Sequence, residues 1–471
     1  MKKSQLINIL NTFSAKEIRE TRKWLRSPAH NQRQDVVQLF DFFFEDNHLS
    51  KEDCLEKPFV FSWIYPKETY DDAKMRQVMF FLLKAIEDFL IYQELHQDEV
   101  SAKNILSKVY RKRKLDKLFE KNIKQSEQLL EKSTIQNEKY YRNEYQLQLE
   151  KYNYQSRVNR LSQNLQEVSD TLDIVFLAGK LRQYCLMLSH QSVYQKEYTI
   201  GLLKNILPLI QQEDYIKIPA IATYYFIYKT LTEKENEAHY FQLKDQIKEN
   251  GHYFPFAEIR DIYLMTINYC IKRMNAGNES FIREAFELYQ LGFENRILIE
   301  NNSITRVTFH NVISIGLKLK EFEIVENFIE ENQKYLSDKH REGFLNYSLA
   351  RLHYEKKEYT KAMQLLVQDI HYEDILIFLT SKTLLSRMYY EEDEVDALES
   401  LIESMRTYIQ RKKIMGYHKA NFKNYIRFIK KLLKAKPSDK TGKEKLKVEI
   451  QEAHPLTTDE RNWLLTQLSK I

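Results

Sequence analysis

The residues of this 471-residue sequence that could do chemistry are mainly cations near its C-terminal end. Residues 406–447 include fifteen Lys and Arg residues but only two acidic ones, whereas residues 321–403 include nineteen acidic and nine basic ones. Six of these cations recur at helical spacing and share one stripe about 80° wide, with Phe422 and Ile426 on the opposite side. This set, called the basic stripe below, consists of Lys412, Lys419, Lys423, Arg427, Lys430 and Lys434.

The basic stripe has three interpretations. It can be the solvated face of a helix, or it can dock on an acidic protein surface, such as this chain's own 321–403 segment. It can also bind the phosphate backbone of a nucleic acid, in which case affinity falls steeply with salt because bound counterions are released.

The sequence contains no local pattern typical of an enzyme. The Gly-rich loops that hold phosphates or dinucleotides, the serine nucleophile elbow and the paired histidines of zinc proteases do not occur. The densest metal-like cluster, His371-Tyr372-Glu373-Asp374, falls short of three or four converging ligands. Cys54, Cys185 and Cys270 lie far apart, which fits neither a disulfide framework nor a zinc site. We therefore predict a non-enzymatic protein without a cofactor or a metal.

The acidic run Glu391-Glu392-Asp393-Glu394 offers paired carboxylates. Adjacent acidic residues in a helix or turn point in different directions, so they rarely act on one substrate atom. We predict that this run is a solvated loop between two helices.

The elements that must position these residues are helices. The chain has only 9 Gly and 8 Pro, although 43% of its residues are hydrophobic and 13% are aromatic. Folds rich in strands and turns need glycine and proline, whereas helix interiors exclude both. The longest apolar run, 78–83, is far shorter than the roughly 20 residues of a membrane span. With no signal peptide visible at the start, the sequence predicts an all-α cytoplasmic protein.

Five segments follow from the pattern of caps and apolar residues. We predict a compact helical module over 1–100, a long helical hairpin over 101–176, helix pairs over 177–433, a flexible basic linker over 434–447 and a capping helix over 448–471. Two capping boxes predict the start of a helix near each end of the chain, one from Ser14 to Glu17 and one from Thr457 to Glu460.

One helix pair resembles the tetratricopeptide (TPR) repeat. In 349–366, Leu349 and Ala350 match its first helix, Tyr359 its turn aromatic, and Ala362 the small residue at which the two helices cross. Degenerate copies lie 37 residues earlier and about 36 later, with Val325 and Leu398 in place of the small residue. The resemblance implies that 177–433 is a TPR-like α-solenoid. The order of segments also resembles a family of bacterial TPR-like helical proteins without an assigned activity. The residues that carry this second resemblance are Lys16-Glu17-Ile18-Arg19, Ser27-Pro28, Asn31, Tyr70-Asp71-Asp72, Lys180-Leu181-Arg182 and Trp463-Leu464-Leu465.

The TPR resemblance also implies a concave groove that binds a peptide or a protein segment. The residues that it places on this groove are His310, Ser314, Leu317 and Lys318, then Tyr347, Arg351, Tyr354 and Glu355, then Thr383, Arg387, Tyr390 and Glu391. Arg351 and Arg387 fall at one repeat position, where two guanidinium groups could clamp a carboxylate or a phosphate. We therefore predict a non-catalytic scaffold or adaptor that binds a protein partner. The alternative is a nucleic-acid-associated scaffold that uses the basic 406–447 segment.

Overall fold

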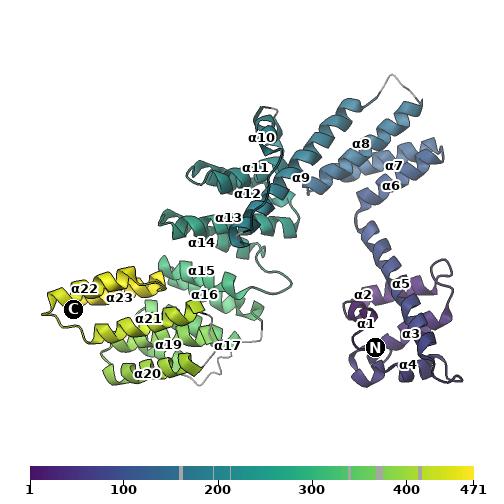
Figure 1. Ribbon diagram of the computed structural model, residues 1–471. Coiled ribbons are helices and arrows are strands. Elements are labelled where there is room, and N and C mark those ends of the chain that lie inside the picture. The colour runs from purple at the N-terminus through teal and green to yellow at the C-terminus, as the bar shows by residue number, and fades with distance from the viewer. Residues whose placement is uncertain (159–162, 195, 213, 338–340, 368–374, 412–415) are drawn as a thin grey trace. The chain divides into compact units, whose positions relative to one another are not determined.

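The computed structural model describes the whole chain except residues 159–162, 195, 213, 338–340, 368–374 and 412–415 (Figure 1). The described residues form twenty-three α-helices and five short 3-10 helices. Their one β-type contact is an isolated bridge between Glu300 and Ser303. The all-α fold predicted from the scarcity of glycine and proline is confirmed.

The chain divides into two compact units. Unit 1 comprises Met1–Tyr228 and His252–Phe254, and unit 2 comprises Lys229–Gly251 and Pro255–Ile471. The segment boundary that the sequence predicts at residue 176 lies inside helix α9 (Leu165–Tyr194), not between two helices.

The first part of unit 1 is a helical module with its own apolar core. Its helices are α1 (Gln5–Leu10), α2 (Ala15–Arg26), α3 (Gln34–Phe44), α4 (Lys57–Ile64) and α5 (Asp72–Gln97). The capping box predicted at Ser14 and Glu17 starts α2. Apolar side chains of α3 and α5, such as Phe40 and Leu82, are fully buried in one cluster.

The segment that follows differs from the single hairpin expected over 101–176. Four helices occur here, α6 (Glu99–Lys112), α7 (Asp116–Glu131), α8 (Glu138–Val158) and α9; α6 contacts α7, and α8 contacts α9. The extra turn lies at Lys114, which adopts a left-handed backbone with φ of 57° and ends α6. An ion pair across 2.7 Å from Arg111 Nε to Glu150 Oε2 joins α6 to α8. Unit 1 continues through α10 (Leu203–Gln212) and into α11 (Pro219–Thr232).

Unit 2 is a succession of helices in which neighbours along the chain pack together. The helices are α12 (Ala238–Asn250), α13 (Phe256–Asn275), α14 (Ser280–Glu294), α15 (Arg306–Lys318), α16 (Phe322–Asn332), α17 (Arg341–Glu355), α18 (Tyr359–Val367), α19 (Ile375–Glu391), α20 (Val395–Arg411), α21 (Gly416–Leu433), α22 (Lys440–Glu452) and α23 (Thr458–Lys470). Three pairs of helices that are two apart also make contact, α15 with α17, α17 with α19, and α21 with α23 (Figure 1). Residues of α17, α19, α21 and α23 line a common pocket.

The predicted linker over 434–447 is wrong in its second half. Helix α22 begins at Lys440, where the Asp439 side chain accepts a hydrogen bond of 2.8 Å from the Gly442 N–H. Leu446 and Ile450 lie one turn apart on α22 and are buried in the same cluster as Leu464 of α23. This apolar pair gives the lysine-rich helix one buried face. The C-terminal end is thus a pair of helices, of which α23 begins with the predicted capping box at Thr457 and Glu460.

None of the helices within the described residues has both the length and the apolar composition that a membrane span requires.

A glycine on α15 makes room for Val325 of α16. Val325 stands where the TPR resemblance expects a small residue, and it is fully buried. Its methyl group packs against Gly316 of α15, where a Cβ atom would collide with Val325 and lie 2.9 Å from Cε2 of Phe286.

We predict that Gly316→Ala lowers the free energy of unfolding by about 1–3 kcal/mol, because the added methyl overpacks a filled core. Gly416→Ala is the matched control, since a Cβ there meets nothing within 4 Å among the described residues. Denaturant unfolding followed by circular dichroism measures both. Equal stability of the two variants would contradict the close packing of α15 on α16.

Candidate binding pocket

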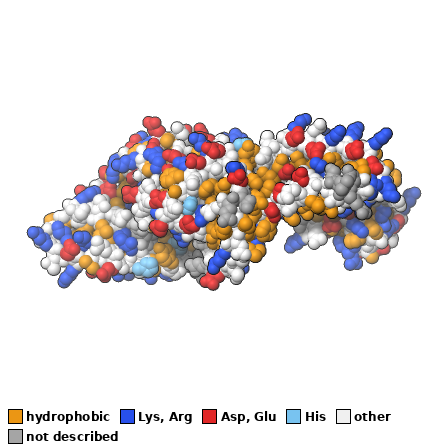
Figure 2. Space-filling view, turned by 90° about the horizontal axis from the view of Figure 1, so that it is seen from above, with side chains coloured by type: hydrophobic (Ala, Val, Ile, Leu, Met, Phe, Trp, Pro, Cys, Tyr) orange, Lys and Arg blue, Asp and Glu red, His pale blue; other side chains and the backbone are white. Residues whose placement is uncertain are grey.

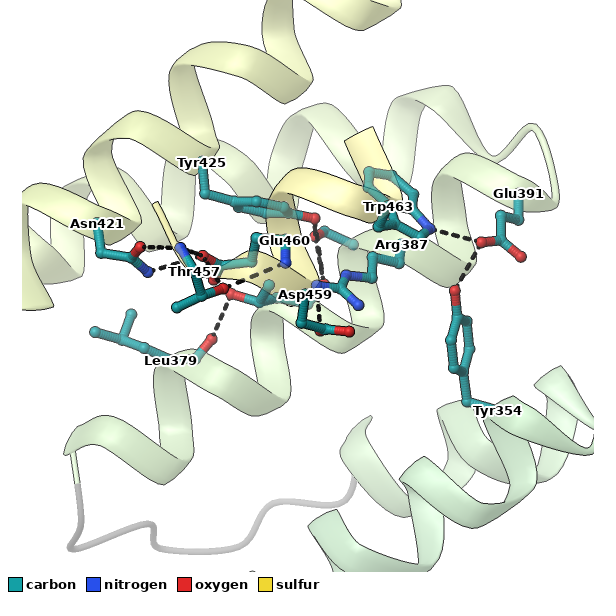
Figure 3. Close-up of polar contacts among 12 residues, drawn as sticks. Tyr354, Leu379, Arg387, Glu391, Asn421, Tyr425, Thr457, Asp459, Glu460 and Trp463 are labelled. Atoms are coloured by element: carbon teal, nitrogen blue, oxygen red, sulfur yellow. Dashed lines mark hydrogen bonds and ion pairs between the residues drawn. The ribbon is translucent and has the colours of Figure 1, made fainter. Parts of the chain in front are cut away.

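Four helices of unit 2 surround a pocket of about 330 Å³. One wall carries residues of α17 and α19 that the TPR resemblance assigns to the groove, namely Tyr347, Arg351, Tyr354, Thr383 and Arg387. The opposite wall comes from α21 and the start of α23, with His418, Asn421, Phe422, Asp459 and Glu460. The groove expected to be open over α19 is therefore closed at this end by the chain's own C-terminal helix (Figure 3).

Arg387 is the buried cation of the pocket. The residue is 7% exposed, and its Nη2 lies 2.8 Å from Oδ2 of Asp459 at the start of α23. Burial opposes its charge, but the neighbouring Asp459 carboxylate raises the pKa of Arg387 above its usual value. The neighbouring Arg387 guanidinium lowers the pKa of the Asp459 carboxyl below its usual value. The Arg387 Nε is buried and has no hydrogen-bond partner within the described part of the chain.

Arg351 lies on the same wall, one helix away. Its Nη1 donates a 2.8 Å hydrogen bond to Ser314 Oγ of α15. Among the residues that the structure describes, no carboxylate pairs with it. Its guanidinium carbon lies 5.9 Å from the centre of the Tyr347 ring. The pocket thus has one arginine that is already paired with a carboxylate and one that is not.

The other expected groove residues have different surroundings. His310 and Ser314 are half-buried on α15, and Lys318 is exposed at its end. The Thr383 hydroxyl donates to the Leu379 carbonyl of its own helix at 2.9 Å. Tyr390 packs edge-on against Trp463 of α23, with ring centres 5.5 Å apart. Of these five residues of α15 and α19, only Thr383 lies on the pocket wall.

Glu391 holds α23 in place beside the pocket. Its Oε1 accepts hydrogen bonds from Tyr354 Oη at 2.7 Å, Trp463 Nε1 at 2.7 Å and Gln467 Nε2 at 3.1 Å. Its other oxygen accepts from the Tyr359 hydroxyl. Burial alone would raise the pKa of Glu391, but the hydrogen bonds from the two tyrosines and Trp463 lower it below its usual value.

This arrangement corrects the prediction for the acidic run 391–394. Glu392, Asp393 and Glu394 are exposed as expected, but Glu391 is the last residue of α19 and only half-exposed. The direction of its side chain depends on where the helix ends, which sequence spacing alone does not fix.

Asn421 connects α21 to the first turn of α23. Its Nδ2 donates to Glu460 Oε2 at 2.9 Å, and its Oδ1 accepts from the Thr457 N–H at 2.9 Å. Glu460 also accepts from the Thr457 hydroxyl at 2.8 Å within the capping box. Sequence analysis found the capping box but missed Asn421 and Asp459, because nothing local links them to residues 36 or more positions away.

Four residues of the basic stripe, Lys419, Lys423, Arg427 and Lys430, lie on α21, and Lys434 follows its last residue. Lys423, Arg427 and Lys434 are exposed, and Lys419 and Lys430 are half-exposed, whereas Phe422 and Ile426 on the inner face are buried. Lys430 Nζ lies 3.4 Å from Glu403 Oε2 of α20, the stripe's one contact with the acidic 321–403 segment among the described ion pairs. Lys412 lies outside the described residues. On the face drawn in Figure 2, basic and acidic side chains are interspersed over the molecule.

The sequence singled out two further candidate groups for metal or redox chemistry. The cluster His371-Tyr372-Glu373-Asp374 lies outside the described residues. Within the described ranges, no group of three or more His, Cys, Asp or Glu side chains converges on a common point. Cys54, Cys185 and Cys270 are free, and the last two are buried.

Comparisons with protein-family models, with curated proteins and with solved structures find no match to this chain. The pocket is therefore interpreted from its own geometry.

The stability of the folded protein depends on pH through His310 of α15. Burial, aided by the nearby Arg351 charge, lowers the pKa of His310 to about 4 in the folded protein, against about 6.5 in the unfolded chain. Between pH 6.5 and 4 the unfolded chain takes up a proton that the folded protein does not, so stability is lost as the pH falls through this window. We predict that wild type loses about 1–2 kcal/mol more than His310→Gln between pH 7 and pH 5. Urea unfolding at both pH values measures this, and an identical loss in the two proteins would contradict the burial of a neutral His310.

Proposed function

We propose that the protein is a non-catalytic scaffold or adaptor, in which the helix pairs of unit 2 form a TPR-like α-solenoid and the pocket receives a segment of a protein partner. One observation carries the proposal. Tyr347, Arg351, Tyr354, Thr383 and Arg387 come from two helices, and all five line the same pocket.

The packing of unit 2 supports the repeat part of this proposal. In stacks of helix pairs, the first helix of each pair contacts the first helix of the next, which builds one continuous inner face. The contacts of α15 with α17 and of α17 with α19 follow this pattern. Arg351 and Arg387 lie on α17 and α19, so the pattern puts both on such a face.

The pocket's size and lining support a chain segment as the ligand. A volume of about 330 Å³ is at the lower end of ligand pockets. It has room for one or two side chains of a peptide. Aromatic walls from Tyr347, Tyr354 and Phe422 surround a few charged groups, which is the composition of sites that fix the orientation of a ligand. We also propose a cytoplasmic location, which the three free cysteines support.

A second candidate function uses the basic stripe. Lys423 and Arg427 on α21 and Lys434 just after it are exposed, and none forms an ion pair among the described residues. This leaves three cations free to contact the phosphates of a nucleic acid.

A pull-down with the tagged full-length chain, in low and in moderate salt, tests both candidates. We expect a defined protein partner that survives moderate salt, and at least a tenfold loss of that partner with Arg351→Glu, because the reversed charge faces the ligand. Lys361→Glu is the matched control, since Lys361 is exposed on α18 outside the pocket. Mass spectrometry identifies the partner.

Retention of the partner by Arg351→Glu would contradict the pocket as its binding site. Nucleic acid that binds in low salt and is lost as salt rises, with no protein partner, would favour the basic stripe as the functional surface.

A further inference from the structure

The ion pair in the pocket is asymmetric. Arg387 is almost fully buried, whereas the Asp459 side chain is 83% exposed. A buried guanidinium without a counter-charge is strongly unfavourable. An exposed carboxylate loses little when it turns toward water, because exposed ion pairs contribute little. Arg387 is therefore the fixed member of the pair, and Asp459 is the member that can be exchanged.

The two arginines retain unused hydrogen-bonding capacity. A guanidinium has five N–H donors. Arg387 uses Nη2 for Asp459, and its buried Nε has no partner within the described residues. Arg351 uses Nη1 for Ser314 and pairs with no carboxylate in that same part of the chain. Donors from two adjacent helices thus line one 330 Å³ pocket.

The start of α23 adds to the attraction for negative charge. Thr457 caps this 13-residue helix, and its first turn lines the pocket next to Arg387. The N-terminal end of a helix carries a partial positive charge, which favours an anion.

The charges of the pocket select the kind of anion. Glu355, Asp459 and Glu460 also line it, so a ligand meets three carboxylates as well as two arginines. A phosphate group, with a charge of about −1.5 to −2, is repelled more strongly by these carboxylates than a single carboxylate. The group that already occupies Arg387 is itself a carboxylate, that of Asp459.

We propose that the pocket is a carboxylate-binding site in which Asp459 is an internal ligand of Arg387, and in which an Asp or Glu side chain of the partner replaces it, with Arg351 as the second donor. The inference rests on the proposed function, because it specifies which part of a protein partner the pocket accepts. Asp459 then competes with the partner and weakens its binding.

Binding of a model peptide to the full-length chain tests this. The probe is a peptide with blocked ends, acetyl-Gly-Gly-Glu-Gly-Gly-amide, compared with its Gln counterpart and with inorganic phosphate. The readout is the indole N–H signal of Trp463, whose ring lies 5.5 Å from the Arg387 guanidinium, in ¹⁵N NMR spectra. Trp24→Phe and Trp63→Phe assign this signal by elimination, since the chain has three Trp.

We expect the Glu peptide to shift the Trp463 signal and the Gln peptide and phosphate to bind more weakly. Asp459→Asn should lower the Kd for the Glu peptide about five- to tenfold, because it removes the competing carboxylate. Glu355→Gln also removes one negative charge from the pocket, but Glu355 is not the carboxylate that pairs with Arg387. We therefore expect this variant to change the Kd no more than about twofold. Arg351→Gln, at a half-exposed position, should raise the Kd at least fivefold and leave the fold unchanged.

Three outcomes would overturn the proposal: an unchanged or higher Kd in Asp459→Asn, tighter binding of phosphate than of the Glu peptide, or no shift of the Trp463 signal with any probe. If these occur while the pull-down partner still depends on Arg351, the carboxylate assignment fails and the proposed function stands. If the peptide binds as expected but no partner is captured, the proposed function fails and the carboxylate site stands.

Discussion

The C-terminal end of unit 2 depends on one half-buried carboxylate, that of Glu391. A carboxylate removed from water is unfavourable unless hydrogen bonds replace its solvation. Glu391 obtains them from Tyr354 on α17 and from Trp463 and Gln467 on α23. Because these donors belong to different helices, satisfying the charge fixes α23 against α17 and α19. The first turn of α23 is thereby held beside Arg387, and the pocket has its second wall.

The same wall explains why the pocket combines opposite charges. Closing the groove with α23 buries Arg387, and Asp459 supplies the counter-charge from the first turn of that helix. Asn421 fixes the direction of this turn through Glu460 and the Thr457 N–H. The helix that covers the end of unit 2 thus also lines the pocket, so stability and the proposed recognition share residues.

Much of the fold could be predicted from sequence, because it depends on local chemistry. The scarcity of glycine and proline predicts helices, and the capping boxes at Ser14 and Thr457 predict where two of them begin. The TPR resemblance selected Arg351 and Arg387, which do line one pocket.

The features that were missed depend on contacts between distant segments. Asp439, which caps α22, and Leu446, which is buried, lie in a lysine-rich segment, so the sequence did not reveal the helix that they support. Gly316 makes room for Val325 only because two helices meet there. The acidic run 391–394 gives no sign that its first member is an internal acceptor, since the donor Trp463 lies 72 residues away.

The most direct test of this account is native-state hydrogen exchange of the α23 amides in wild type, in Glu391→Gln and in the neighbouring control Glu392→Gln. The account predicts that the α23 amides of wild type exchange as slowly as those of α19. Glu391→Gln should accelerate α23 exchange about 10- to 100-fold, because it weakens charge-assisted hydrogen bonds with a combined contribution of about 1.5–3 kcal/mol, and Glu392→Gln should leave it unchanged. Rapid exchange of α23 in wild type, or no effect of Glu391→Gln, would show that α23 is not held by Glu391 and that the pocket lacks its second wall.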